Sequence, residues 1–196
     1  MKTLITGGNK GLGLYLTERF NADSISRANG FDITKDEHRI AEKSLDYDVF
    51  INNAFDGPPH EPWANFGQTN VYHAVFEAWR AANKSGYIFN IGSVGSKTIV
   101  AIDPSFETYR VSKAALERAS KQGTQSFKVN QAKFKTTLLT LDRLDTPLSR
   151  SRPNWTGNGV PSDDICNFIN LCLGMTNTCI EEAVFYCNFD YVGESK

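Results

Sequence analysis

The sequence predicts an α/β fold in which helices cover both faces of a doubly wound parallel sheet. Short apolar runs typical of buried parallel strands recur along the chain, and segments with helical periodicity lie between them. The first run, Lys2–Thr6, leads through a glycine turn into a helical segment, as at the start of a βαβ unit. With 196 residues, no repeat and no linker, residues 1–196 are predicted to form a single domain.

The first turn of the chain predicts a nucleotide-binding site. The opening strand breaks at Gly7-Gly8-Asn9-Lys10-Gly11-Leu12-Gly13, and the helix that follows has Leu12, Leu16 and Phe20 on one stripe. Glycine suits this turn because a Cβ would block the close approach of a phosphate. Backbone N–H groups at the start of a helix then bind the phosphate.

The elements of the first half follow in order. A second strand is expected at Ser24–Ser26 and a short third extended piece at Phe31–Ile33. Thr34 can cap a helix that runs through Ser44, with acidic residues in its first turn. Asp48–Ala54 is expected to be a central strand with a polar end, and the prolines that follow it indicate a loop.

The second half continues the alternation. Apolar residues at helical spacing predict helices at Asn70–Asn83 and Glu107–Gly123, and Ser162 is expected to begin a late helix through Leu173. Strands are expected at Tyr87–Ile91, Thr137–Leu141 and Ala183–Cys187. Residues 92–106 are expected to be loop, and 147–161 irregular.

Composition narrows the classes of function. The net charge is -1, the pI is about 6.3 and no basic tract occurs, so no nucleic-acid partner is expected. No apolar run is long enough to span a membrane, and no signal peptide precedes the glycine turn. The four cysteines lack a Cys-x-x-Cys spacing and a nearby histidine, so we expect reduced thiols and no metal site. These features favour a cytoplasmic protein.

Tyr109 and Lys113 form the most informative pair of side chains. Residues four apart lie one turn apart on the same face of a helix. An ammonium held near a phenol favours the phenolate, so this spacing predicts a Tyr pKa lowered toward the range useful for proton transfer. Ser93 and Asn53 follow predicted strands directly, at the edge where open α/β sheets bind ligands. Asn70 is an N-cap candidate.

These residues together resemble the short-chain dehydrogenase/reductases over nearly the whole chain. The shared features occur in the family's order: Thr6-Gly7 with Gly11 and Gly13, Asp32, Asn52-Asn53-Ala54, Asn70, Ser93, and Tyr109 with Lys113. The resemblance implies a Rossmann-like fold. It also implies that Tyr109 is the general acid/base, that Ser93 holds the substrate oxygen, that Lys113 binds the nicotinamide ribose and that Asn70 anchors a water in a proton relay.

The same resemblance implies a dinucleotide site. Asp32 would contact the adenine, and Asn53 would brace the central strands near the cofactor. The residues expected to contact the dinucleotide are Gly7, Asn9, Lys10, Gly11, Leu12, Gly13, Arg27, Asp32, Asn53, Ala54, Tyr109, Lys113 and Thr146.

The chain departs from the family pattern in several places. Phe55 replaces the glycine after Asn-Asn-Ala, and Leu141-Asp142 replaces a Pro-Gly pair. Ser93 lies further from Tyr109 than is usual, and Ser96, at the usual distance, is an alternative for the catalytic serine. The chain is also shorter than most members, so it looks like a compact branch of the family.

Charge predicts the cofactor. An acidic residue at the end of the second strand would pair with a ribose 2′-hydroxyl, but this chain has Ser26-Arg27 there. Arg27 can bind a phosphate through two nitrogens, and Lys10 adds a second positive charge. We therefore predict NADP(H), with NAD(H) possible as the cofactor.

The predicted function is hydride transfer between NADP(H) and a carbonyl or alcohol of a small molecule. A non-catalytic NADP(H)-binding sensor or interaction protein and an epimerase or dehydratase of the same fold are the alternatives. Residues 147–161, with Leu148, Trp155 and Val160, are expected to form a substrate lid. Phe55, Trp63 and Phe106 are candidates for the pocket wall. The resemblance also implies a homodimer or homotetramer, paired through helices 70–83 and 107–123.

Overall fold

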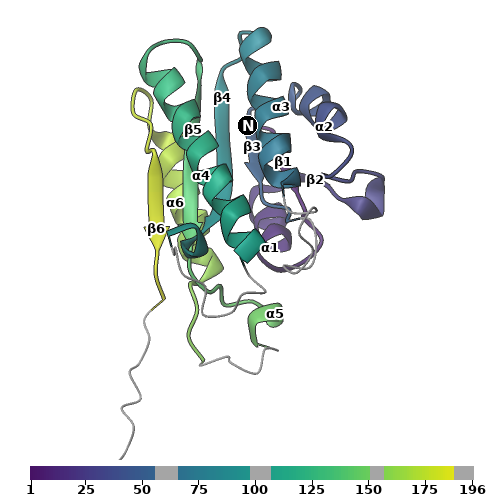
Figure 1. Ribbon diagram of the computed structural model, residues 1–196, viewed down its shortest axis with the longest axis vertical. Helices are drawn as coiled ribbons and strands as arrows, with labels where there is room; N and C mark the ends of the chain where they lie inside the picture. The colour runs from purple at the N-terminus through teal and green to yellow at the C-terminus, as the bar shows by residue number, and fades with distance from the viewer. Residues whose placement is uncertain (56–65, 98–106, 151–156, 188–196) are drawn as a thin grey trace, which may run out of the picture.

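The computed structural model describes residues 1–55, 66–97, 107–150 and 157–187 (Figure 1). Six parallel strands form one sheet in the order β2-β1-β3-β4-β5-β6. Their bounds are β1 Thr3–Thr6, β2 Asp23–Ile25, β3 Val49–Asn52, β4 Gly86–Ser93, β5 Phe134–Leu141 and β6 Glu182–Phe185. The chain steps outward from β1 to β2 and then returns past β1 to β3, so the predicted doubly wound sheet is confirmed.

Helices cover both faces of this sheet. The α-helices are α1 Gly11–Phe20, α2 Glu37–Ser44, α3 Gly67–Ala81, α4 Glu107–Lys128, α5 Pro147–Arg150 and α6 Ser162–Gly174. Two short 3-10 helices, η1 Arg27–Asn29 and η2 Val94–Lys97, follow β2 and β4. Figure 1 shows α3 and α4 in front of the sheet and α6 behind it.

The central strands β1, β3 and β4 send alternate side chains into two separate cores. Leu4, Phe50 and Ile88 pack with α2, α3 and α4 on one face. Their chain neighbours Ile5, Ile51 and Phe89 pack with α1 and α6 on the other. This alternation is the two-residue period of a strand, and burial of both faces explains why the strands are apolar throughout.

The predicted third extended piece is wrong. Residues 31 and 32 have no regular secondary structure and residues 33–35 form a turn, because the Asp32 carboxylate accepts hydrogen bonds from Thr34 N and Thr34 Oγ1, and Asp36 Oδ2 accepts one from Asp32 N. Side-chain bonds of this kind compete with strand pairing. As a result α2 begins at Glu37 rather than directly after Thr34.

Several boundaries also differ from the predicted ones. Strands β4 and β5 are eight residues each, because they pair with one another along their whole length. Helix α4 continues past Gly123, where a Cβ would collide with the Tyr72 hydroxyl of α3. Gly123 therefore permits the close approach of two helices and does not end one.

Within the described ranges, none of the helices combines the length and apolarity that crossing a membrane requires. The four cysteines are free thiols, and the same ranges contain no group of three or more side chains suited to a metal ion.

Candidate active site

The glycine turn after β1 has the shape of a phosphate cradle. Gly7 and Gly11 have φ angles of 74° and 53°, in the left-handed region that favours glycine. A Cβ at Gly13 would collide with Gly7 O. Helix α1 starts at Gly11, so the first N–H groups of that helix have no partner within it. The turn therefore fits the phosphates of a dinucleotide.

Residues from two other segments lie against this turn. Asn53 Nδ2 donates to Thr6 O at 3.0 Å and to Gly7 O at 3.3 Å, while the backbone N–H groups of Asn53 and Ala54 donate to Thr6 Oγ1. Thr146 Cγ2 lies 3.9 Å from the position a Cβ would occupy at Gly11. The structure thus brings Asn53, Ala54 and Thr146 together at the turn, as predicted from the sequence.

The end of β2 adds a positive group to the same edge. Asn9 Nδ2 donates to Ser26 Oγ at 2.8 Å and links the glycine turn to this strand end. Arg27 Nε pairs with Asp32 Oδ2 at 3.0 Å, with the Arg27 side chain mostly exposed. The hydrogen bond from Thr34 N, against the desolvation of the carboxyl, lowers the pKa of Asp32 below its ordinary value, with help from Arg27. Lys10 is exposed at the start of α1.

Ser93, Tyr109 and Lys113 meet at the carboxyl end of β4. Ser93 is the last residue of that strand, and Tyr109 and Lys113 lie in the first turns of α4. A Cβ at Gly95 would lie 3.4 Å from Ser93 Oγ and 3.5 Å from Tyr109 Cε1, so both side chains flank the same backbone position. Lys113 Nζ is 5.7 Å from the centre of the Tyr109 ring. Hydroxyl, phenol and ammonium are therefore neighbours.

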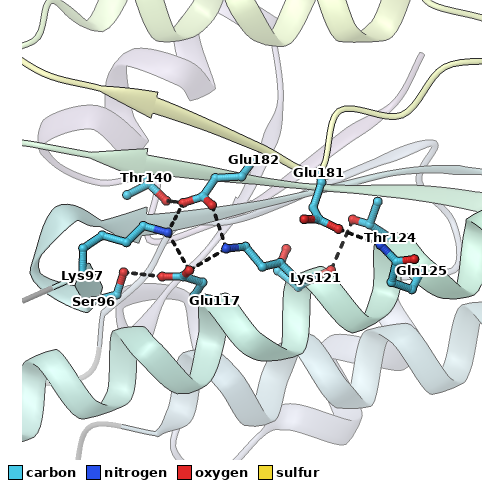
Figure 2. Close-up of polar contacts among 10 residues, drawn as sticks. Ser96, Lys97, Glu117, Lys121, Thr124, Gln125, Thr140, Glu181 and Glu182 are labelled. Carbon is cyan, nitrogen blue, oxygen red and sulfur yellow. Dashed lines mark hydrogen bonds and ion pairs between the residues drawn. The ribbon is translucent and has the colours of Figure 1, made fainter.

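Ser96, the alternative serine, has another partner. Its Oγ donates to Glu117 Oε2 at 2.6 Å. Glu117 belongs to an ion-pair network in which Glu117 and Glu182 each bridge Lys97 and Lys121 (Figure 2). Ser93 is thus the serine that lies beside the phenol.

Asn70 is not brought to this cluster. Its side chain is exposed and lines a groove between α2 and α3 with His73 and Ala74. Helix α3 begins three residues before the predicted start, so Asn70 is not its N-cap. Since each residue turns a helix by about 100°, Asn70 points roughly opposite to Gln68. The structure thus places the Asn70 side chain away from Ser93, Tyr109 and Lys113, and its role in a proton relay stays a prediction.

Gln68, which sequence reasoning missed, lies beside Lys113 instead. Gln68 Oε1 accepts a hydrogen bond from Lys113 Nζ at 2.6 Å, and Ile91 O accepts a second at 3.0 Å. A signal for it existed in the sequence. Val71 and Val75 belong to the buried stripe of α3, and a step of three residues back from Val71, which stays on the same helix face, reaches Gln68.

Gln68 and Lys113 belong to a buried chain of amides. Asn52 Nδ2 donates to Gln68 O and to Asn90 Oδ1, each at 2.9 Å, and Asn90 Nδ2 donates to Ser120 Oγ. Asn52 Oδ1 is buried and has no hydrogen-bond donor among the described residues. An unpaired buried acceptor costs about 1–3 kcal/mol, a destabilisation that calls for a functional explanation.

Phe55 packs directly on the reactive pair. Its ring meets the Tyr109 ring edge-on, with 5.0 Å between the ring centres, and Lys113 Nζ lies 5.2 Å from the Phe55 centre. An ammonium over an aromatic face is an attractive cation–π contact. The residue that departs from the family pattern therefore covers both groups.

The predicted lid region is only partly described. Helix α5 lies in this region. Arg150 donates hydrogen bonds to the Asp145 carboxylate through Nε at 2.6 Å and through Nη2 at 3.0 Å. Val160 is buried, bridges to Leu144 and packs in the core beside α6, so it is not part of a lid surface. Trp63, Phe106 and Trp155 lie outside the described residues, and the side chain of Leu148 is not described.

No protein-family model matches this chain, and no curated protein matches it by sequence. Solved structures do match. A short-chain dehydrogenase from Burkholderia cenocepacia in complex with NADP gives a TM-score of 0.70 at 20% identity, covering 94% of this chain and 89% of that one. A β-ketoacyl-acyl carrier protein reductase from Bacteroides thetaiotaomicron gives 0.69 at 20% identity, with 95% and 97% covered.

A 3-α-hydroxysteroid dehydrogenase from Pseudomonas sp., complexed with NADH, gives a TM-score of 0.67 at 16% identity, with 94% of each chain covered. At these identities the similarity establishes the architecture of the sheet and its helices. The resemblance predicted from the motifs is thus confirmed for the fold: this chain has the fold of the short-chain dehydrogenase/reductases.

Proposed function

We propose that this protein is an oxidoreductase that transfers hydride between NADP(H) and a carbonyl or alcohol group of a small molecule. The observation that carries the proposal is the meeting of Ser93, Tyr109 and Lys113 on the sheet edge that also holds the glycine turn. Ligands of open parallel sheets bind at this edge. The similar structures with NADP or NADH bound add support.

Different residues would bind the cofactor and transfer the proton. The glycine turn would hold the phosphates, and Lys113 and Tyr109 would hold the other end of the dinucleotide. Bound there, a reduced nicotinamide supplies the hydride. Tyr109 would give its phenolic proton to the substrate oxygen, and the Ser93 hydroxyl would donate a hydrogen bond to that oxygen. A donor placed in advance at a developing oxyanion lowers a barrier by roughly 3 kcal/mol. We further propose a single-domain, homo-oligomeric, cytoplasmic enzyme.

Replacing Tyr109 by phenylalanine tests the mechanism. Tyr109→Phe removes the proton donor but keeps the ring, so turnover should fall by about 10²–10⁴-fold while the dinucleotide still binds. The measurement is loss of NADPH absorbance with a panel of carbonyl compounds, beside a fluorescence titration of NADPH. Tyr186→Phe, at an exposed tyrosine, is the matched control. Retained turnover in Tyr109→Phe contradicts the role given to the phenol.

The preference for NADP(H) has its own test. Asp32 holds Arg27 through Nε, and a bidentate grip on a 2′-phosphate uses the terminal nitrogens of a guanidinium. Arg27→Ala should weaken NADPH binding by about tenfold and leave NADH binding unchanged. Arg39→Ala, which removes an exposed arginine paired with Asp36, is the control. Equal affinities of the unaltered protein for NADH and NADPH would refute the preference.

The position of Phe55 favours one alternative function, a non-catalytic NADP(H)-binding sensor. Its ring covers Tyr109 and Lys113, as suits a protein that binds the dinucleotide without reducing a substrate. Tight NADPH binding with no turnover of any compound in the panel would support such a sensor.

A further inference from the structure

Both polar atoms of the Gln68 side-chain amide make hydrogen bonds inside the site. It is 3% exposed and lies in the first turn of α3. Oε1 accepts from Lys113 Nζ at 2.6 Å, while Nε2 donates to Asn52 O at 2.7 Å and to Ile91 O at 3.0 Å. These contacts join α3 to the ends of β3 and β4 and to α4. A glutamine this buried and this fully bonded is fixed in one orientation.

We propose that Gln68 is the positioning residue of Lys113, whose ammonium it holds beside the Tyr109 phenol. The inference rests on the proposed function, in which Lys113 serves both the phenol and the dinucleotide. It replaces Asn70, whose side chain lies on the opposite side of α3.

The orientation of the Gln68 amide follows from its neighbours. Two backbone carbonyls, Asn52 O and Ile91 O, lie within hydrogen-bond distance of Nε2. A flipped amide would point its oxygen at both carbonyls and lose every donor there. Oε1 is therefore the atom that faces Lys113, and the ammonium has an acceptor that cannot rotate away.

The neutrality of Gln68 matters as much as its position. Lys113 is 4% exposed, and two of its hydrogen bonds go to neutral oxygens, Gln68 Oε1 and Ile91 O. A carboxylate at position 68 would cancel the ammonium charge locally. The Gln68 and Ile91 oxygens stabilise the ammonium and add no countercharge of their own to the field acting on the phenol, whose ring centre is 5.7 Å away. An acid at position 68 would weaken that field, whereas the amide does not.

The backbone of Gln68 is itself held by the sheet. Asn52 Nδ2 donates to Gln68 O, and the same nitrogen donates to Asn90 Oδ1. Asn90 in turn accepts this bond and donates to Ser120 on α4, seven residues after Lys113. The amide chain closes a loop through α3, β3, β4 and α4, so Gln68 is held on the side of α3 that faces Lys113.

Two variants separate the effects of position and charge. Gln68→Met keeps the length of the side chain and removes the acceptor. Gln68→Glu keeps the shape and adds a compensating charge. Gln122→Met, at an exposed glutamine of α4, is the matched control. The first readout needs no ligand: the pH at which the Lys113 ammonium loses its proton, followed by NMR of protein with labelled lysine side chains and assigned with Lys113→Arg.

Gln68→Met should move that titration to lower pH by about one unit, and Gln68→Glu to higher pH by a similar amount. In kinetics, Gln68→Glu should shift the pH–rate profile about one unit to higher pH, because a weakened positive field favours the protonated phenol. If Gln68→Met does not fold, the Lys113 titration of Gln68→Glu alone tests the inference.

Two results overturn the inference. One is a Lys113 titration that is the same in the folded Gln68 variants and in the unaltered protein. The other is an Asn70→Ala variant that reproduces the shifts. An inactive protein whose Lys113 titration still moves as stated refutes the proposed oxidoreductase while leaving Gln68 as the residue that positions the ammonium.

Discussion

Phe55 is the single residue that most distinguishes this site. Its contacts with Tyr109 and Lys113 are each worth roughly 0.5–1.5 kcal/mol, and a dinucleotide that reaches the same two groups must displace the ring or share their space. Phe55→Ala should therefore bind NADPH about fivefold more tightly. The measurement is a fluorescence titration, with Phe66→Ala, at an exposed phenylalanine, as control. Weaker binding in Phe55→Ala would show instead that the ring contacts the cofactor.

At this scale the sequence predicted which side chains lie together where helix and strand spacing decides it. Tyr109 and Lys113 share a helix face because they are four residues apart, and Ser93 ends a strand that the apolar pattern predicted. Gln68 lies before Asn70, the predicted start of the helix, so the sequence did not predict a place for it on a helix face. Because α3 begins at Gly67, Gln68 lies in its first turn and is buried, whereas Asn70 is exposed.

The ion-pair network acts between elements. It joins η2, which follows Ser93 directly, to α4 through Glu117 and to β6 through Glu182 (Figure 2). Burial opposes the charge of Glu117, but hydrogen bonds from Lys121, Lys97 and Ser96 outweigh it and lower its pKa from 4.5 to about 2. The network fixes one end of the segment that carries Gly95.

That depressed pKa gives a prediction for stability. A carboxyl whose folded pKa lies below its unfolded value stabilises the fold above the unfolded value and loses this contribution as pH falls toward the folded one. Glu117→Gln should therefore lower the free energy of unfolding by about 2 kcal/mol at pH 7, with the deficit shrinking between pH 4.5 and about 2. Urea unfolding at several pH values measures this.

Glu77→Gln is the comparison, since its pair with Arg80 is half exposed and such pairs contribute little. A deficit for Glu117→Gln that is constant with pH would mean that packing, rather than charge, stabilises the network.

Among the elements, the sequence placed the main helices and most strands, because these have long periodic patterns. It misplaced Phe31–Ile33, where the Asp32 carboxylate forms a turn, since a three-residue pattern cannot exclude local side-chain bonds.

For the whole molecule, the parallel sheet explains why fold class was more predictable than detail. Strands buried on both faces are mainly apolar, a pattern visible in Tyr87–Ile91, where Asn90 is the polar exception. Their lengths depend on partners distant in sequence: β4 and β5 extend because they pair over eight positions. The role of Gly123 also depends on a partner distant in sequence, because a Cβ there would collide with the Tyr72 hydroxyl of another helix.

The position of β6 in the chain has a consequence for synthesis. Among the described strands it comes last, and it lies at one edge of the sheet. Lys97, Lys121 and Glu117 therefore leave the ribosome well before Glu182, their fourth partner. A nascent chain holds two cations against one carboxylate until β6 emerges. β6 thus supplies the counter-charge as well as the last backbone hydrogen bonds of the described sheet, and the ion-pair network beside the segment after Ser93 is complete only once β6 has been synthesised.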